Sequence, residues 1–201
     1  MASYRQSGQA GVRAFDCVSA LVLGVVAAPF VLIAAVAIRL DSRGPVLYRQ
    51  VRVGQEGRPF WMLKLRTMQV DAEADGVARW AVSRDQRVTR VGRALRRCRI
   101  DEVPQLWNVV RGDMSLIGPR PERPPFVDTL SRELPGYSLR HRVKPGLTGW
   151  AQVRCGYASC IDEAARKLEH DLFYVSHRNW RLDLRIVLET IFVVLLGIGS
   201  R

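Results

Sequence analysis

The chain contains little histidine, cysteine and lysine, and these shortages exclude several kinds of site. Only three of its 201 residues are histidine and four are cysteine. No CxxC pair occurs and no His/Cys cluster has zinc-ligand spacing, which argues against a zinc protein. Four scattered cysteines fit a reducing compartment. The sequence also lacks internal repeats, low-complexity tracts and any RNA- or DNA-binding motif with interleaved aromatic residues.

Arginine is what the chain has in excess. Its 31 basic residues outnumber 19 acidic ones, the formal net charge is +12, and only Lys64, Lys144 and Lys167 are lysine. So basic a chain predicts an anionic partner, which can be a nucleic acid, a phosphorylated ligand or an acidic membrane surface. The guanidinium fork suits phosphate, although a GC-rich genome would also enrich arginine. The length predicts one domain with a substantial core.

Residues 18–38 form an uninterrupted apolar segment of 21 residues, long enough to cross a bilayer as a helix. A secretory signal peptide is disfavoured because the apolar core is too long, although residues 35–37 resemble a cleavage site. A simple span would place Arg13 on one side of the membrane and Arg39, with the basic body, on the other. The positive-inside rule favours keeping the larger basic portion in the cytoplasm.

A re-entrant helix is the third interpretation of this segment. Pro29 lies near its middle, where proline removes a backbone hydrogen bond and kinks or breaks a helix. A helix broken at Pro29 can enter and leave the same leaflet, which keeps Arg13 and Arg39 at one interface. Since spanning helices also tolerate proline, the residues alone leave span and re-entry balanced.

Periodicity and turn signals predict a β-hairpin and several helices in the rest of the chain. The predicted hairpin has strands at 46–53 and 59–66 around a turn at 54–57. The predicted helices are a short helix or loop at 69–80, a cationic helix at 89–99, a helix at 103–110 with Pro104 in its first turn, and an amphipathic helix at 161–176.

Four further segments carry weaker signals. Residues 119–125 hold four prolines, which predicts irregular structure, and residues 132–142 resemble a polar linker. Residues 143–153 predict a glycine-punctuated loop that runs into a short strand. Residues 186–198 are apolar but too short to span comfortably, so they are expected to lie in the membrane interface or pack on the core.

Two adjacent carboxylates, Asp101 and Glu102, open the predicted helix directly after the arginine run. Because the first residue of a helix is not yet helical, both side chains can face one pocket. An aspartate there can attack phosphorus to give an acyl phosphate, and the pair can hold Mg²⁺ together with substrate phosphates. The competing interpretation is a helix cap followed by a first-turn acid.

Four cations are candidates for binding phosphate or nucleotide. Arg96 lies in the arginine run, and Arg120 stands between two prolines that restrict its backbone. Lys64 and Arg66 are two residues apart and so share one face of a strand. The alternative for Arg96 is a place on a solvated or lipid-facing cationic surface. The alternative for Arg120 is an exposed position on a rigid turn, and for Lys64 and Arg66 it is the polar face of a hairpin.

Several long, ordered motifs resemble those of the bacterial sugar transferases, the monotopic polyprenyl-phosphate phosphoglycosyl transferases, and are most similar to the exopolysaccharide-linked branch. Residues 64–68 (KLRTM) resemble the family's KFR(S/T)M with leucine for phenylalanine. In many small members serine precedes the kinking proline, whereas here Ala28 does. The other matching stretches are residues 41–50 (DSRGPVLYRQ), 101–106 (DEVPQL), 112–121 (GDMSLIGPRP), 144–152 (KPGLTGWAQ) and 171–174 (DLFY).

The resemblance implies an α+β, mainly helical, monotopic membrane protein. Its parts would be an N-terminal re-entrant membrane helix (residues 1–40) and a catalytic domain (residues 41–201) that contains the hairpin and an interfacial C-terminal helix. The chain starts about a dozen residues before the apolar segment, which predicts a short member or the catalytic domain of a longer one. The expected location is the cytoplasmic face of the bacterial inner membrane, and a homodimer is compatible with it.

The activity that the resemblance implies is transfer of a sugar-1-phosphate from a UDP-sugar to undecaprenyl phosphate, with release of UMP, as the first membrane step of exopolysaccharide or surface glycan assembly. Asp101 would be the nucleophile that forms a covalent phosphosugar adduct. Glu102 would help to place Mg²⁺ or the acceptor phosphate, with Asp101 and Glu102 as the metal ligands. Arg96 would bind phosphate, and Arg120 the nucleotide or its diphosphate.

A rival hypothesis is a non-enzymatic, membrane-tethered basic protein that binds nucleic acid or anionic lipid. The net charge favours it, whereas the adjacent acids and the interrupting prolines do not, so no nucleic-acid partner is expected. No residue in the sequence decides which sugar the donor carries.

Overall fold

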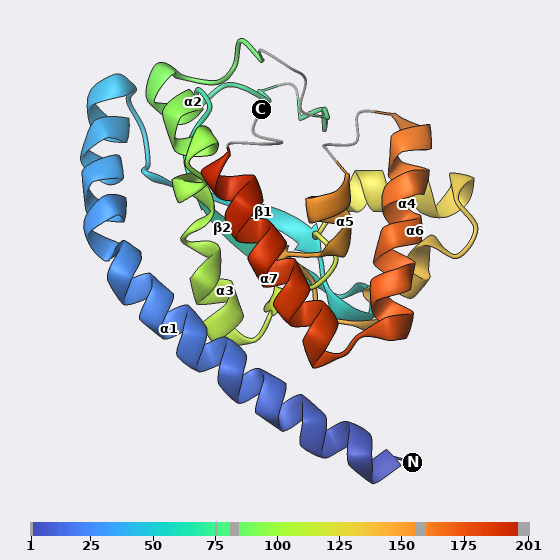
Figure 1. The fold of residues 1–201 in the computed structure, drawn as a ribbon. Coiled ribbons are helices and arrows are strands. Elements are labelled where there is room, and N and C mark those ends of the chain that lie inside the picture. Colours follow the sequence, from blue (N-terminus) through green and yellow to red (C-terminus); the bar gives the residue numbers. More distant parts are fainter. Residues whose placement is uncertain (1, 75, 81–84, 156–159, 197–201) are drawn as a thin grey trace.

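The computed structural model describes residues 2–74, 76–80, 85–155 and 160–196, and it is mainly helical with two small sheets (Figure 1). One long helix, α1 (Ala2–Asp41), runs along one side of the body, and the start of this helix projects beyond it. The hairpin lies centrally, with α7 (Trp180–Leu195) crossing in front of it. The predicted α+β, mainly helical class and the long apolar N-terminal helix are thereby confirmed.

Helix α1 carries the apolar segment. It contains Pro29, and its axis changes direction part of the way along (Figure 1), as a proline inside a helix causes. Its stretch Ala10–Asp41 is the one helix in the described part of the chain that is long and apolar enough to cross a membrane. Most of its large side chains, such as Val25, Leu32 and Ile33, are exposed to the surroundings. An apolar surface of this extent indicates contact with lipid.

Both ends of the apolar segment are attached to the body. Near its start, the buried Asp16 accepts hydrogen bonds from Ser115 Oγ (2.7 Å) and the Leu116 N–H (3.2 Å). Arg13 donates to the carbonyl oxygens of the last turn of α3 (Gln105–Arg111), where a cation also complements the helix dipole. Near its end, Ala34 and Ile38 pack in a cluster with Leu65 and Leu95.

The predicted hairpin is confirmed. Strands β1 (Leu47–Val53) and β2 (Pro59–Leu65) pair antiparallel, from Leu47 opposite Leu65 to Val53 opposite Pro59. A short 3₁₀ turn, η1 (Gln55–Gly57), connects them. The side chains of β2 that point away from solvent, Phe60 and Met62, join a core cluster with α1 and α3.

Asn108 fastens α3 to the hairpin. Its side chain is fully buried, and its amide donates to Trp61 O (2.7 Å) and to the Asp113 carboxylate (3.1 Å). Its side-chain oxygen accepts the Leu63 N–H at 3.0 Å. One buried amide therefore satisfies two backbone groups on β2 that the hairpin leaves unpaired.

The cationic helix is α2 (Arg90–Arg97), and Thr89 caps it by accepting the Gly92 N–H at 3.0 Å. A side-chain carbon at Gly92 would lie 2.1 Å from Thr67 O, so only glycine lets the helix approach this closely. The adjacent acids were expected on the first turn of the next helix. They lie instead in a separate 3₁₀ turn, η2 (Ile100–Glu102), because Arg99 adopts a left-handed conformation and Pro104 starts α3 afterwards.

Three sequence-based expectations for residues 119–153 are corrected. The proline-rich stretch does not stay irregular to its end, because α4 (Pro124–Glu133) starts with prolines in its first turn, where no N–H is needed. The expected linker is largely a 3₁₀ helix, η3 (Tyr137–Arg142), with two buried side chains. In the expected loop the strand comes first, as β4 (Gly146–Thr148), and the helix α5 (Trp150–Arg154) follows. Strand β4 pairs in parallel with β3 (Ser115–Ile117), which the sequence did not reveal.

The two last helices agree with their amphipathic patterns. Helix α6 (Ile161–His177) buries Leu168 and Tyr174, and α7 buries Ile186 while Leu188 and Phe192 are exposed. Helix α7 begins earlier than the apolar run does, because Asn179 caps it. The last two residues of the apolar segment predicted at 186–198, residues 197 and 198, lie outside the described residues.

Replacing Asn108 with alanine should lower the free energy of unfolding by about 2 kcal/mol, because backbone groups on β2 lose their buried partners. Thermal unfolding in detergent, followed by circular dichroism, measures this change. Arg111→Ala removes an exposed side chain from the same helix and should shift stability by less than about 0.5 kcal/mol. Equal stability of the Asn108 variant and wild type would contradict the conclusion that the Asn108 hydrogen bonds stabilise the contact between α3 and the hairpin.

Candidate active site

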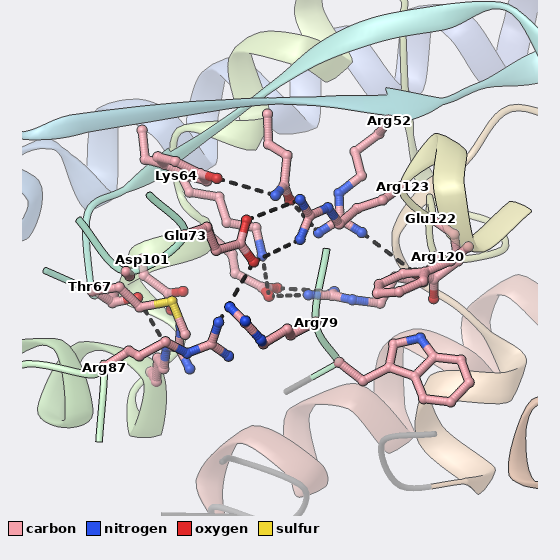
Figure 2. Close-up of a pocket in the computed structure, with 18 of the residues that line it drawn as sticks. Arg52, Lys64, Thr67, Glu73, Arg79, Arg87, Asp101, Arg120, Glu122 and Arg123 are labelled. Atoms are coloured by element: carbon pink, nitrogen blue, oxygen red, sulfur yellow. Dashed lines mark hydrogen bonds and ion pairs between the residues drawn. The ribbon is translucent and has the colours of Figure 1, made fainter. Parts of the chain in front are cut away.

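A polar cavity of about 540 Å³ opens beneath the hairpin, and both carboxylates of η2 line it (Figure 2). The volume suits a nucleotide-sized ligand. Among the lining residues are the four predicted cations, Lys64, Arg66, Arg96 and Arg120. The structure therefore brings every predicted polar site residue to one cavity, from β2, α2, η2 and the segment between β3 and α4.

Arg99 sets the direction of the carboxylate pair. It has a φ of 57°, in the left-handed region that non-glycine residues rarely occupy. This conformation ends α2 and turns the chain so that Asp101 and Glu102 point into the cavity, where they are 6% and 8% exposed. Backbone strain of this kind often marks a functional site.

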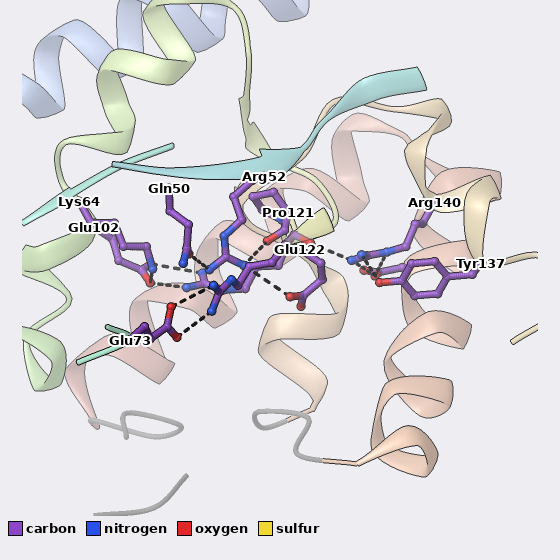
Figure 3. Close-up of polar contacts among 12 residues, drawn as sticks. Gln50, Arg52, Lys64, Glu73, Glu102, Pro121, Glu122, Tyr137 and Arg140 are labelled. Carbon is purple, nitrogen blue, oxygen red and sulfur yellow. Dashed lines mark hydrogen bonds and ion pairs between the residues drawn. The ribbon is translucent and has the colours of Figure 1, made fainter. Parts of the chain in front are cut away.

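Glu102 is surrounded by cations. Arg120 donates to both of its carboxylate oxygens, at 2.5 Å and 3.4 Å, while Lys64 lies at 3.6 Å and Arg99 at 3.9 Å (Figures 2 and 3). Burial alone would raise the pKa of Glu102. The positive charges of Arg120 and Lys64 outweigh burial and hold that pKa well below its usual range. Glu102 is consequently ionised throughout the physiological pH range.

Asp101 behaves differently although it is adjacent. Burial, followed by the negative charge of Glu102, raises the pKa of Asp101 to about 6, and Lys64 and Arg96 oppose the rise. Its Oδ1 is buried without a hydrogen-bond partner in the described part of the chain. Two neighbouring carboxylates with separated pKa values indicate different chemical roles. An ionised aspartate with an unengaged oxygen is suited to attack an electrophile.

The donor set fits a hard cation only in part. The unpartnered Asp101 Oδ1 is an open ligand position, whereas both oxygens of Glu102 are engaged by Arg120. The described residues contain no group of three or more His, Cys, Asp or Glu side chains that converge on one point. Mg²⁺ commonly takes one or two carboxylates and completes its shell with water and substrate phosphate, so these two residues suffice when a phosphorylated ligand is present.

Two of the predicted cations are held by structural hydrogen bonds. Arg96 Nε donates to Thr67 Oγ1 at 2.9 Å, which fixes its stem beside the cavity. The guanidinium of Arg66 donates to Ser42 O (2.8 Å) and Arg43 O (2.9 Å) in the turn after α1. Arg66 thus lines the cavity but directs its terminal nitrogens to the turn that follows α1. Its expected phosphate contact stays a prediction.

The loop that carries Arg120 is held from both sides by arginines that sequence reasoning missed. Arg52 Nη1 donates to Pro121 O at 3.1 Å, and Arg140 Nη2 donates to the carbonyl of Arg120 itself at 2.8 Å (Figure 3). Arg140 is anchored in turn on Asp171, at 2.6 Å. Arg140 is buried and Arg52 is partly buried, and their hydrogen bonds fix where the loop lies.

A second missed group closes the outer part of the cavity. Glu73, in the loop after β2, forms two hydrogen bonds with Arg123, at 2.8 Å and 2.9 Å (Figure 2). Trp80 packs beside Phe126 with 5.3 Å between the ring centroids, and both line the cavity. No local sequence signal distinguishes these residues from other surface charges and aromatics.

An apolar groove of about 950 Å³ lies next to the polar cavity. Helices α1 and α7 supply most of its apolar lining. Four charged residues line both the groove and the cavity: Arg99, Glu102, Arg120 and Lys167. The two spaces therefore adjoin at a charged wall beside Asp101.

Comparisons with known proteins show which family the chain resembles. A family model described as bacterial sugar transferase matches residues 8–197. The chain is 47% identical over 189 residues to the UDP-N-acetylgalactosamine-undecaprenyl-phosphate N-acetylgalactosaminephosphotransferase of Aeromonas hydrophila, covering 94% of this chain and 44% of the relative. It is 47% identical over 183 residues to the UDP-glucose:undecaprenyl-phosphate glucose-1-phosphate transferase of Caulobacter vibrioides, covering 89% and 67%.

A third relative is similar in length. The exopolysaccharide production protein PSS of Rhizobium leguminosarum bv. phaseoli is 41% identical over 186 residues, covering 89% of this chain and 92% of the relative. The chain thus spans less than half of the Aeromonas relative, two thirds of the Caulobacter relative and nearly all of the Rhizobium one. With the family model matching almost its whole length, the chain belongs to the bacterial sugar transferase family.

Proposed function

We propose that this protein transfers a sugar-1-phosphate from a UDP-sugar to undecaprenyl phosphate and releases UMP. The observation that carries the proposal is the buried Asp101 with its unengaged oxygen, placed among cations where a polar cavity meets an apolar groove. The polar cavity suits the charged donor, and the groove suits a lipid acceptor. The names of the relatives, which include two transferases that act on undecaprenyl phosphate, support the same reaction.

In the first half-reaction a carboxylate oxygen of Asp101 attacks the sugar-bearing phosphorus of the donor. A bond forms between that oxygen and phosphorus, the phosphorus–oxygen bond to UMP breaks, and UMP leaves with the bonding electron pair. The enzyme then holds the sugar phosphate as an acyl phosphate on Asp101. Because the pKa of Asp101 is about 6, most of this side chain is ionised at neutral pH.

In the second half-reaction a phosphate oxygen of undecaprenyl phosphate attacks the same phosphorus. The new bond joins the two phosphates, the bond to Asp101 breaks, and the aspartate carboxylate is regenerated. The product is a sugar diphosphate carried on the lipid. In this two-step exchange Asp101 is the nucleophile of the first step and the leaving group of the second.

Cations beside Asp101 stabilise the charge that develops on the phosphates. Arg120 and Lys64 are already held in the cavity by Glu102, so little reorganisation is needed when the donor binds. Arg96 adds a third positive charge next to Asp101. Asp101 and Glu102 would hold Mg²⁺ together with the donor diphosphate, and the ion would neutralise phosphate charge there.

The attachments of α1 support a re-entrant membrane helix. Residues at both ends of the apolar segment, Asp16 and Ile38, contact the same catalytic body, and the helix bends between them (Figure 1). A straight span would separate these two contacts by the thickness of the bilayer. The proposed arrangement puts the bend in one leaflet and the cavity at the cytoplasmic face of the inner membrane, where nucleotide sugars are available.

The name of the Rhizobium relative supports a role in exopolysaccharide or surface glycan assembly. The relatives' names specify different sugars, N-acetylgalactosamine in one and glucose in another. The donor is therefore proposed as the class of UDP-sugars.

Replacing Asp101 with asparagine should lower UMP formation by about 10⁴-fold or more, because the amide cannot form the acyl phosphate. The assay mixes the protein in nanodiscs with a panel of UDP-sugars, Mg²⁺ and undecaprenyl phosphate, and intact-mass spectrometry detects the adduct. Asp128→Asn is a matched control, because Asp128 lines neither space, and it should keep wild-type activity. Normal turnover by the Asp101 variant would overturn the nucleophile assignment.

The rate of UMP release in the first turnover should fall on acidification with a midpoint near pH 6, because protonation removes the nucleophilic carboxylate. In Glu102→Gln the overall rate drops, but the midpoint should move to lower pH, since a negative charge that raises the pKa of Asp101 is gone. Rapid-quench measurements across pH 4.5–8 determine the midpoint for wild type and for the variant. A midpoint that stays in place or rises in the variant would contradict this coupling.

Chelation with EDTA should lower UMP formation by at least about tenfold, because the phosphate charge is then less well neutralised. Adding excess Mg²⁺ back to the same sample should restore the rate. Ca²⁺ serves as the control cation, because it binds carboxylates with longer bonds and a looser geometry. An undiminished rate in EDTA would exclude Mg²⁺ from the reaction.

A further inference from the structure

Lys167 lies on α6 at the wall where the polar cavity and the apolar groove adjoin. Three other residues line both spaces, and they already interact with one another, because Arg99 and Arg120 form ion pairs with Glu102. Within the described residues, no carboxylate lies within 4.0 Å of the Lys167 ammonium group. Lys167 is therefore the cation at this wall that has charge available for a ligand.

The two carboxylates whose charges act on Lys167 are both paired with arginines. Asp171 pairs with Arg140 at 2.6 Å, and Glu122 pairs with Arg52 at 3.5 Å (Figure 3). Burial lowers the pKa of Lys167, and the attraction of Glu122 only partly opposes this effect. A partly buried ammonium group without an ion-pair partner is costly. An arriving phosphate would relieve that cost.

The groove that ends at Lys167 suits an apolar chain. Helix α1 contributes Val22, Val26 and Phe30 to its lining, and α7 contributes Val187, Ile191 and Val194. Both helices expose further apolar side chains to their surroundings, so the groove is continuous with surface that is expected to meet lipid. A ligand that enters from this side would carry an apolar chain and an anionic end, and the anionic end would arrive at Lys167.

We propose that Lys167 binds the phosphate of the acceptor lipid while the lipid chain occupies the groove between α1 and α7. The inference rests on the proposed function and assigns the acceptor's place within it. Lys167 would hold the attacking phosphate on the groove side of Asp101, whereas Lys64 and Arg120 serve the donor side. The ammonium group would thus position the second substrate without taking part in release of UMP.

The test separates the two half-reactions. In nanodiscs, UMP release in a single turnover without acceptor reports the donor step, and the KM for undecaprenyl phosphate reports the acceptor. In Lys167→Met the rate of this single-turnover UMP release, the burst, should stay within about twofold of wild type. The KM for undecaprenyl phosphate should rise about tenfold or more, as loss of a charge-assisted contact implies. Lys144→Met is the matched control, because Lys144 lines neither space, and it should change neither quantity.

Lys167→Arg distinguishes phosphate binding from a packing role. It keeps the positive charge and should recover most of the loss in KM, whereas a purely structural lysine would not be rescued by charge. A slower burst with an unchanged KM would assign Lys167 to the donor, and no change in either quantity would also overturn the proposal. Absence of any burst in wild type would instead contradict the covalent mechanism, and the KM comparison alone would then decide the role of Lys167.

Discussion

The structure around the cavity depends on the buried ionised Glu102. Its carboxylate lies within reach of Arg120, Lys64 and Arg99, so three cations from three different segments converge on one anion. Without that anion the cations would repel one another in a poorly hydrated cavity, and each would be costly to bury. The same charge also raises the pKa of the neighbouring Asp101. One side chain therefore both gathers the cations around the cavity and raises the pKa of Asp101, the proposed nucleophile.

The side chains that line the cavity are held in position by other residues of the body. The left-handed Arg99 directs the two acids, Asn108 fastens α3 to the hairpin that bears Lys64, and Arg140 holds the carbonyl of Arg120. These residues lie on elements far apart in the chain, and most of them are buried. Preorganisation of this kind is what phosphoryl transfer requires, because the protein contributes mainly positioning and charge.

The placement of the membrane helix gives the site its two entrances. Helix α1 is held to the body at Arg13 and Asp16 on one side of its bend and at Ala34 and Ile38 on the other. Its exposed apolar face then forms one wall of a groove that ends at the charged residues shared with the polar cavity. In the proposed reaction, the water-soluble donor and the lipid acceptor approach Asp101 from different phases.

The sequence by itself determined the local elements and predicted the chemistry that is proposed for the site. The strand signals at 46–53 and 59–66 predicted the hairpin, the apolar run predicted the long N-terminal helix, and the adjacent acids with their arginines predicted phosphate chemistry, because each signal lies within one continuous segment of the chain. Only the tertiary structure decided that Arg52, Arg140 and Lys167 line the cavity, that a linker-like stretch contains η3 with two buried side chains, and that β3 pairs with β4. Those features arise from contacts between distant segments, and a buried arginine or lysine has the same local sequence signature as a solvated one.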